Sequence, residues 1–295
     1  VTCLTYLPDG RLVSGGMDNK LCLWAATGAS CRDMVGHTSS VSVVKASASG
    51  GMVVSGGYDR TVRCWDTRRG AEVCALTGGH SGPVLDLALL PGTVVSGGRD
   101  SKVLLWDLET GKCRRSLTGH KGHITAVEWF ADAGEAGDGS QLVLSGAQDG
   151  HLRVWDLRSQ SCVANVPAHT SDSGSGAVGS IACTAMSASA LGGLAGDMVV
   201  TIGADKAVVV SDPRRNFEPL RRWTEHREFP YSLTVAGPLV FSGDGAGMLL
   251  AHDIDSGKLL YGLGANEGAV RCLGAVGDKL VAAGDDGNGL VFTFR

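Results

Sequence analysis

The sequence lacks the features of several protein classes. None of its apolar runs reaches 18 residues, so no membrane span is predicted. It has no leader of basic, apolar and small residues of the kind that a secretory signal peptide needs. Lys and Arg number 26 against 30 Asp and Glu, which gives a formal net charge of −4. Without a surplus of positive charge, we expect no general attraction to nucleic acid or to an anionic membrane.

The nine cysteines contain no C-x-x-C pair, and their number is odd. Both observations argue against a disulfide framework and against a zinc site. We interpret the cysteines as small buried hydrophobic residues in a reducing compartment. This predicts an intracellular protein, in the cytoplasm first, with the nucleus and the cilium or cytoskeleton as alternatives.

What the sequence does contain is a tryptophan position that returns at a nearly constant interval. Trp24, Trp65 and Trp106 are each 41 residues apart, and Trp155 follows after 49. The same position recurs with other residues at Ser211, His252 and Phe292. A period of about 40–45 residues, with Gly-His upstream and Trp-Asp downstream, is typical of one blade of a β-propeller. Seven such positions predict seven blades.

These residues resemble the repeats of the WD-repeat family over essentially the whole chain. The resemblance implies an all-β, seven-bladed WD-repeat β-propeller that folds as a single domain, because no blade can bury its faces alone. Apolar residues alternating with polar ones, and Gly or Asp at each break, predict short antiparallel strands within each blade. The predicted blades cover residues 1–35, 36–78, 79–118, 119–167, 168–224, 225–264 and 265–295.

The last blade is predicted to lack its closing outer strand within this chain. Phe292 to Arg295 ends the third strand of that blade, and Val1 already stands at the head of an inner strand. In the family resembled, an N-terminal strand usually completes the last blade. We therefore expect residues upstream of Val1 to supply it, since the blade would otherwise carry an exposed sheet edge.

In the family resembled, a His, a Ser or Thr, an Asp and a Trp form a hydrogen-bonded chain inside each blade, here called a tetrad. Each group is buried, so each needs its partner. The complete tetrads are His37, Ser55, Asp59 and Trp65 in blade 2, His80, Ser96, Asp100 and Trp106 in blade 3, and His120, Ser145, Asp149 and Trp155 in blade 4. We expect rigidity to be concentrated in these three blades.

The later blades keep only part of the tetrad. Blade 5 keeps His169, Thr201 and Asp205; blade 6 keeps His226 and Ser242 but has Ala246 at the Asp position; blade 7 keeps only an aspartate, Asp286, with Asn266 at the His position. Blade 1 has no His. Insertions rich in Gly, Ser or Ala also lengthen blades 4 and 5, at 130–141, 170–179 and 185–196, and we interpret them as tolerated rather than functional.

Catalytic and cofactor chemistry is not indicated. Ser, His and Asp recur in blade after blade, whereas a catalytic triad occurs once. Gly174, Gly176 and Gly179 spell G-x-G-x-x-G, but no strand-to-helix turn surrounds them, so a linker is favoured over a dinucleotide site. His120 and His123 are spaced like metal ligands, but no acidic or thiol ligand lies near them in sequence. We predict no enzyme activity, no cofactor and no metal.

In the family resembled, the loops that carry the His and the Asp surround the mouth of a central channel. The residue before each blade Asp points into this mouth, and Tyr58 and Arg99 are of types enriched at interface hot spots. This predicts a peptide-binding patch, with an ordinary exposed rim as the alternative. The predicted residues are Met17, Tyr58, Arg99, His123, Gln148, Phe229 and Tyr231.

The predicted function is a non-catalytic scaffold for protein–protein interaction, which binds peptide segments or partner domains on the mouth face. One alternative is the substrate-recognition propeller of an F-box-type ubiquitin ligase, because even blades with short turns, as at 87–92, are similar to F-box/WD-repeat proteins. Another is a structural subunit of a large cytoskeletal or ciliary assembly. The expected partners are proteins. Nucleic acid is disfavoured, because only four separated Arg pairs interrupt a net acidic chain.

Overall fold

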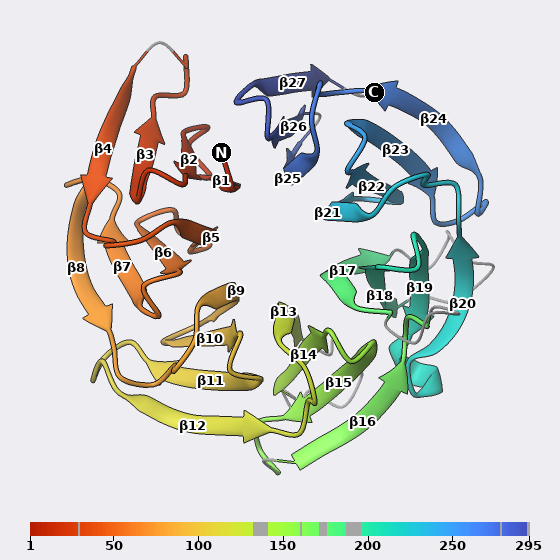
Figure 1. The fold of residues 1–295 in the computed structure, drawn as a ribbon, viewed down its shortest axis with the longest axis horizontal. Helices are drawn as coiled ribbons and strands as arrows, with labels where there is room; N and C mark the ends of the chain where they lie inside the picture. Colours follow the sequence, from red (N-terminus) through yellow and green to blue (C-terminus); the bar gives the residue numbers. More distant parts are fainter. Residues whose placement is uncertain are drawn as a thin grey trace.

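The strands form seven antiparallel sheets arranged radially around one axis (Figure 1). The computed structural model describes residues 1–28, 30–131, 141–159, 161–170, 176–186, 196–277 and 279–293. Each sheet is one blade, so the seven-bladed β-propeller predicted from the tryptophan interval is confirmed. In this described part of the chain, no helix is long and apolar enough to cross a membrane.

Within each blade the strands follow one another outward from the axis in sequence order. Blade 1 consists of β1 (Cys3–Tyr6), β2 (Leu12–Gly15), β3 (Lys20–Trp24) and β4 (Cys31–Val35). Blade 2 consists of β5 (Val41–Ala46), β6 (Met52–Gly57), β7 (Val62–Asp66) and β8 (Ala71–Leu76). Blade 3 consists of β9 (Val84–Leu90), β10 (Thr93–Gly98), β11 (Lys102–Asp107) and β12 (Cys113–Thr118).

The next three blades also have four strands. Blade 4 consists of β13 (Ile124–Ala131), β14 (Gln141–Ala147), β15 (His151–Asp156) and β16 (Ser161–Pro167). Blade 5 consists of β17 (Val178–Met186), β18 (Gly196–Gly203), β19 (Val208–Asp212) and β20 (Glu218–Trp223), with the 3₁₀ helix η1 (Pro213–Arg215) before its last strand. Blade 6 consists of β21 (Pro230–Ala236), β22 (Leu239–Asp244), β23 (Met248–Asp253) and β24 (Leu259–Gly264).

Blade 7 has three strands within the described residues, which confirms the predicted lack of a closing outer strand. These are β25 (Val270–Val276), β26 (Lys279–Gly284) and β27 (Gly289–Thr293). The insertions expected at 130–141, 170–179 and 185–196 lie largely outside the described residues, as does Gly174.

An apolar cluster fills each junction between neighbouring blades, because the blades pack face to face and bury both sides of their middle strands. In β10, for example, Val94 packs toward blade 2 and Val95 toward blade 4. The junction between blades 7 and 1 has the smallest cluster among the described residues. Its four buried members are Leu4, Cys272, Val281 and Ala283. Within the described residues, fewer buried apolar side chains therefore join blade 7 to blade 1 than join any other pair of neighbouring blades.

A β-bulge recurs at the head of the inner strand in blades 2 to 7, where the register with the second strand shifts by one residue. A bulge leaves one residue unpaired and can re-aim its side chain. The bulge residues are Ser42, Leu85, Thr125, Gly179, Tyr231 and Arg271. Thr2 stands at the equivalent position of blade 1, since its N–H donates to Gly15 O at 3.0 Å.

Four hydroxyl groups at these strand heads donate hydrogen bonds to the first inner-strand carbonyl of the next blade. The donor–acceptor pairs are Thr2–Val41, Ser42–Val84, Thr125–Val178 and Ser232–Val270. We call these four side chains the hydroxyl belt. Blades 3, 5 and 7 have Leu85, Gly179 and Arg271 at the bulge and no hydroxyl there. Between blades 3 and 4, Asp86 Oδ2 instead accepts from Val127 N–H at 2.8 Å.

Candidate functional site at the mouth of the ring

Each complete tetrad ties the second and third strands of a blade to the loop that precedes the blade. In blade 3, Trp106 Nε1–H donates to Ser96 Oγ at 2.7 Å, and Ser96 Oγ–H donates to His80 Nε2 at 2.7 Å. His80 Nδ1–H then donates to the Asp100 carboxylate at 3.0 Å. The same chain joins Trp65, Ser55, His37 and Asp59 in blade 2 and Trp155, Ser145, His120 and Asp149 in blade 4.

The tetrads hold the turns of the mouth rather than perform chemistry. Asp100 Oδ2 also accepts from Ser81 N–H at 2.9 Å, which fixes the loop after His80. Burial lowers the pKa of His80, so its ring stays neutral and keeps one donor and one acceptor nitrogen. Ser96 has no exposed surface at all. A serine nucleophile must reach a substrate, and this one cannot.

The incomplete tetrads keep part of these bonds: those of blades 5 and 7 still reach the turn aspartate, whereas that of blade 1 joins only its second and third strands. In blade 5, His169 Nδ1–H donates to Asp205 at 2.8 Å and its Nε2 lies 2.9 Å from Thr201 Oγ1. In blade 7, Asn266 Nδ2–H donates to Asp286 Oδ1 at 2.8 Å. In blade 1, Trp24 Nε1–H donates to Ser14 Oγ at 2.9 Å.

Blade 6 corrects one expectation. The repeat spacing puts Ala246 at the Asp position, which leaves His226 without a carboxylate. In the structure, His226 Nδ1–H donates to Asp244 Oδ2 at 3.1 Å, and His226 Nε2 lies 2.7 Å from Ser242 Oγ. Asp244 stands at the end of β22, where blade 4 has Ala147 and the remaining blades have glycine, and this position is close enough for its side chain to reach the ring. An aspartate two residues after the tetrad serine, as in the sequence Ser-Gly-Asp that ends at Asp244, indicates this alternative partner for the histidine. The repeat spacing alone does not identify it.

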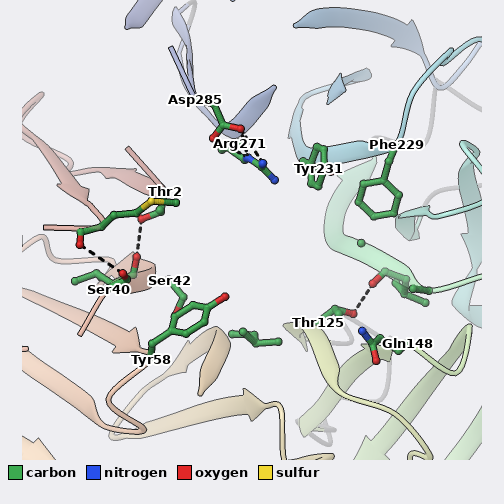
Figure 2. A pocket seen from close by; sticks show the side chains of 16 residues that line it. Thr2, Ser40, Ser42, Tyr58, Thr125, Gln148, Phe229, Tyr231, Arg271 and Asp285 are labelled. Carbon is green, nitrogen blue, oxygen red and sulfur yellow. Dashed lines mark hydrogen bonds and ion pairs between the residues drawn. The ribbon is translucent and has the colours of Figure 1, made fainter. Parts of the chain in front are cut away.

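A hollow of about 750 Å³ opens at the mouth, between the heads of the inner strands (Figure 2). Its lining includes Thr2 and the six bulge residues, together with four of the residues that precede a blade Asp, namely Met17, Tyr58, Gln148 and Asp285. Of the predicted patch, Met17, Tyr58, Gln148, Phe229 and Tyr231 line this hollow. Tyr58 faces it from one side, and Phe229 and Tyr231 face it from the other.

Two predicted residues lie outside the hollow's lining. Arg99 is exposed on the rim, and its N–H donates to Pro83 O at 2.8 Å. His123 is half-buried, and its carbonyl accepts from Gln148 N–H at 3.0 Å. His123 Nδ1 has no hydrogen-bond partner among the described residues. The structure therefore brings five predicted residues together and places these two beside them.

Aromatic and charged side chains from blades 6 and 7 build one wall of the hollow. The Phe229 and Tyr231 rings meet edge to face, with centroids 4.7 Å apart. Arg271 Cζ lies 4.1 Å from the Tyr231 ring centroid, and its Nε and Nη2 donate to Asp285 at 2.7–3.0 Å. These hydrogen bonds raise the pKa of Arg271. The wall is preorganised, because each side chain is held by the next.

The sequence reasoning predicted only Tyr231 among the bulge residues. It missed Arg271, Leu85 and Gly179, which line the hollow together with Thr2, Ser42 and Thr125. A bulge changes which side of the strand a residue faces, and alternation alone cannot place it. One signal was present. A hydroxyl residue sits beside the first Val or Ile of the inner strand in blades 1, 2 and 4.

A second charged group lies deeper, on the inner strands of blades 2 to 4. Lys45 Nζ and Glu128 Oε2 are 3.4 Å apart, and the Glu128 charge raises the pKa of Lys45. Burial raises the pKa of Asp86 to about 6, against the opposing effect of Lys45. These groups face a space of about 500 Å³ beyond the mouth. Lys45 pairs with Glu128, and Asp86 accepts from Val127 N–H, so these groups form part of the ring's wall.

The cysteines only partly behave as the predicted buried hydrophobic residues. All nine are free thiols; Cys3, Cys64 and Cys272 are buried, but Cys31, Cys113 and Cys162 are exposed. The exposed three lie at or near the start of outer strands, where no further strand covers them in the described part of the chain.

One group of side chains in blade 1 has the spacing of a metal site. The ligand atoms of Cys22, Cys31 and Asp33 lie within 4.8 Å of one another. Asp33 already pairs with Lys20 Nζ at 2.8 Å, and a tetrahedral zinc site needs a fourth ligand. Burial and the charge of Asp33 raise the pKa of Cys22 to about 11, so its thiol stays protonated. The mouth is therefore the stronger candidate for a functional site.

Comparison with known proteins identifies the repeats. A family model described as "WD domain, G-beta repeat" matches residues 1–25, 28–66, 72–107 and 111–156. These four segments fall in blades 1 to 4, which contain Trp24, Trp65, Trp106 and Trp155. No curated protein matches the chain.

Proposed function

Because the chain belongs to the WD-repeat family of β-propellers, we propose that it is a non-catalytic scaffold whose mouth hollow binds segments of partner proteins. Propellers of this family commonly serve in protein interaction. The observation that carries the proposal is the hollow itself, which combines exposed large apolar side chains with a preorganised aromatic wall. Met17 is 75% exposed and Tyr58 45% exposed, and the blade 2 tetrad holds the turn that carries Tyr58.

The chemistry of the mouth supports binding rather than catalysis. The serines and histidines with the arrangement of a catalytic triad are buried inside the blades. Arg271 and Asp285 neutralise each other. What faces outward is apolar and aromatic surface with a few polar groups, the composition of a site that recognises a peptide or a domain.

The proposal includes an intracellular location. The exposed thiols of Cys31, Cys113 and Cys162 support it, because free surface thiols persist in a reducing compartment. A substrate receptor of an F-box-type ubiquitin ligase and a subunit of a cytoskeletal or ciliary assembly would each use the same mouth. They are narrower forms of the scaffold proposal, and they differ in what is attached to the ring.

The test is capture of partners by the immobilised protein, with mass spectrometry as the readout. We expect Met17→Ala/Tyr58→Ala to lose partners that the wild type retains, because the double change removes apolar contact area from the hollow. The control is Arg68→Ala/Arg69→Ala, in an exposed turn at the opposite rim. Both variants should unfold at the wild-type temperature, since all four side chains are exposed. The same set of partners on all three proteins would contradict the proposal.

A further inference from the structure

The charges around the mouth are divided between its two sides. Arg60, Arg99 and Lys121 project from the rim turns of blades 2, 3 and 4, and all three are exposed. Within the described residues, none of them has an ion-pair partner. The rim positions of blades 1, 6 and 7 instead carry the exposed carboxylates Asp18, Glu228 and Glu267, with one exposed cation, Arg227, next to Glu228. In blade 5, which lies between these two sides, Lys206 Nζ donates to the backbone carbonyl of Arg227.

The strand-head hydroxyls and the Arg271–Asp285 pair inside the hollow are already bound within the protein. The hydroxyls of Thr2, Ser42 and Thr125 donate to carbonyls of the next blade. Arg271 is held by Asp285 and covers the Tyr231 ring. A ligand in the hollow therefore meets mainly aromatic and apolar surface, and its charge is recognised outside the hollow, by the unpaired cations of the rim.

We infer that the partner segment carries an apolar or aromatic anchor residue followed by acidic residues. This inference rests on the proposed function and specifies its ligand. The anchor enters the hollow between Tyr58 and Tyr231, and the acidic residues extend over Arg60, Arg99 and Lys121. The carboxylates on the other side of the mouth repel the acidic end, so they set the direction in which the segment lies.

Peptide is favoured over nucleic acid by the same features. A nucleic acid needs a continuous basic track along its backbone. Here three cations occupy one side, and the other side carries three carboxylates around a single exposed cation, Arg227. A single deep hollow beside a short basic arc fits one anchored side chain with a few charges next to it.

The experiment selects random dodecapeptides displayed on phage against the immobilised wild-type chain and then measures their binding by fluorescence anisotropy. We expect an aromatic or large aliphatic residue adjacent to Asp or Glu in the selected peptides. Binding should weaken roughly tenfold in Arg60→Glu/Arg99→Glu and should fall with added salt. The matched control, Arg68→Glu/Arg69→Glu on the opposite rim, should bind as the wild type does.

The outcomes separate this inference from the proposed function. Peptides that lose binding in Met17→Ala/Tyr58→Ala but show no acidic preference, or no response to Arg60→Glu/Arg99→Glu, overturn the inference and leave the mouth as the binding site. Peptides indifferent to both pairs of changes overturn both. Failure to select any peptide overturns the inference alone, since partner capture tests the scaffold independently. A single-stranded oligothymidine that binds the mouth as tightly as the selected peptides also overturns it.

Discussion

At the scale of single residues, one carboxylate holds three parts of its blade together. Asp100 accepts hydrogen bonds from the His80 ring, from Ser81 N–H and from Lys102 N–H. Burial alone would raise its pKa, but these hydrogen bonds and the interaction with His80 lower it. The ionised carboxylate is therefore the form on which the rim of blade 3, including Arg99, depends.

We expect Asp100→Ala to lower the free energy of unfolding by about 1–3 kcal/mol, because it leaves the buried His80 Nδ1–H without an acceptor. Urea denaturation of the whole chain measures this. The matched change is Asp286→Ala in blade 7, where the acceptor of Asn266 is lost in a more exposed setting, so the loss of stability should be smaller than for Asp100→Ala. Equal losses would show that burial does not explain the role of the tetrads.

Histidine burial makes stability depend on pH in one direction. Burial lowers the pKa of five histidines below the ordinary value of 6.5; they are His37, His80, His120, His226 and His252. The unfolded chain therefore binds more protons, so their contribution is complete above pH 6.5 and is lost as the pH falls. Asp86, with its raised pKa, acts in the opposite sense, but it is one group against five.

The expected result is a free energy of unfolding that falls between pH 7 and pH 5. Each histidine contributes at most about 1.4 kcal/mol per pH unit to the slope. Urea denaturation across this range measures it. A free energy that is flat, or that rises on acidification, would contradict the assignment of neutral buried rings.

His252 is a buried imidazole at the tryptophan position of blade 6. It has no exposed surface, and it stacks on Trp223 with ring centroids 4.4 Å apart. Neither of its ring nitrogens has a hydrogen bond within the part of the chain that the structure describes. Glu225 Oε2 lies 3.4 Å from Nε2. The ring thus contributes packing area but carries two unsatisfied polar atoms.

We predict that His252→Phe raises the free energy of unfolding by about 1 kcal/mol, since it keeps the stacked ring and removes the unsatisfied nitrogens. Phe292 occupies the same position in blade 7, so the chain already accommodates phenylalanine there. The variant should also show a shallower pH slope. A lower free energy of unfolding in His252→Phe would mean that the Glu225 carboxylate, 3.4 Å from Nε2, stabilises the His252 ring.

At the scale of elements, the strands were more predictable than the direction of their side chains. Tyr58 and Gln148 were placed at the mouth because turns of known position carry them. Arg271 was not, because its bulge reverses the alternation of β25. His123 was expected in the patch from its spacing to His120, but its carbonyl binds Gln148 and its ring lies beside the hollow.

The hydroxyl belt predicts a stability effect that strand propensity would not. Ser42→Ala removes the side-chain hydrogen bonds to Val84 O and to Gly56 O, so we expect a loss of about 0.5–1.5 kcal/mol in the free energy of unfolding. Ser40→Ala, two residues away, is the control. Its hydroxyl makes a 3.4 Å hydrogen bond to Met17 O, and its loss should be within about 0.5 kcal/mol. Equal losses of unfolding free energy in Ser42→Ala and Ser40→Ala would show that the hydroxyl belt does not stabilise the ring.

At the scale of the whole molecule, the tryptophan interval predicted the number of blades because every blade repeats the same antiparallel unit, with this position at or near the end of its third strand. The interval could not predict how well each junction is filled. The thin cluster between blades 7 and 1 depends on which residues meet across the ring, such as Leu4 and Val281, and these are far apart in sequence.

The small apolar cluster between blades 7 and 1 predicts that blade 7 opens to solvent before the other blades. We expect the backbone amides of β26 to exchange with solvent faster than those of β10, its counterpart in blade 3, under native conditions. Blade 7 has no Trp, His or Ser in its tetrad and, in the described residues, no fourth strand, so its local opening costs less free energy. Native-state hydrogen exchange measures both strands in one sample. Equal protection would show that the ring opens only as a unit.

The interruptions in the hydroxyl belt have a consequence for the partner. Gly179 and Arg271 mark two seams in the inner rim, one between blades 5 and 6 and one between blades 7 and 1, and both residues line the mouth hollow. A segment bound in the hollow would contact the two blades on either side of each seam. It would thereby link neighbouring blades at the two junctions where Gly179 and Arg271 interrupt the hydroxyl belt. Because the segment binds only the folded ring, mass action stabilises the folded state, and the melting temperature should rise with the concentration of the segment.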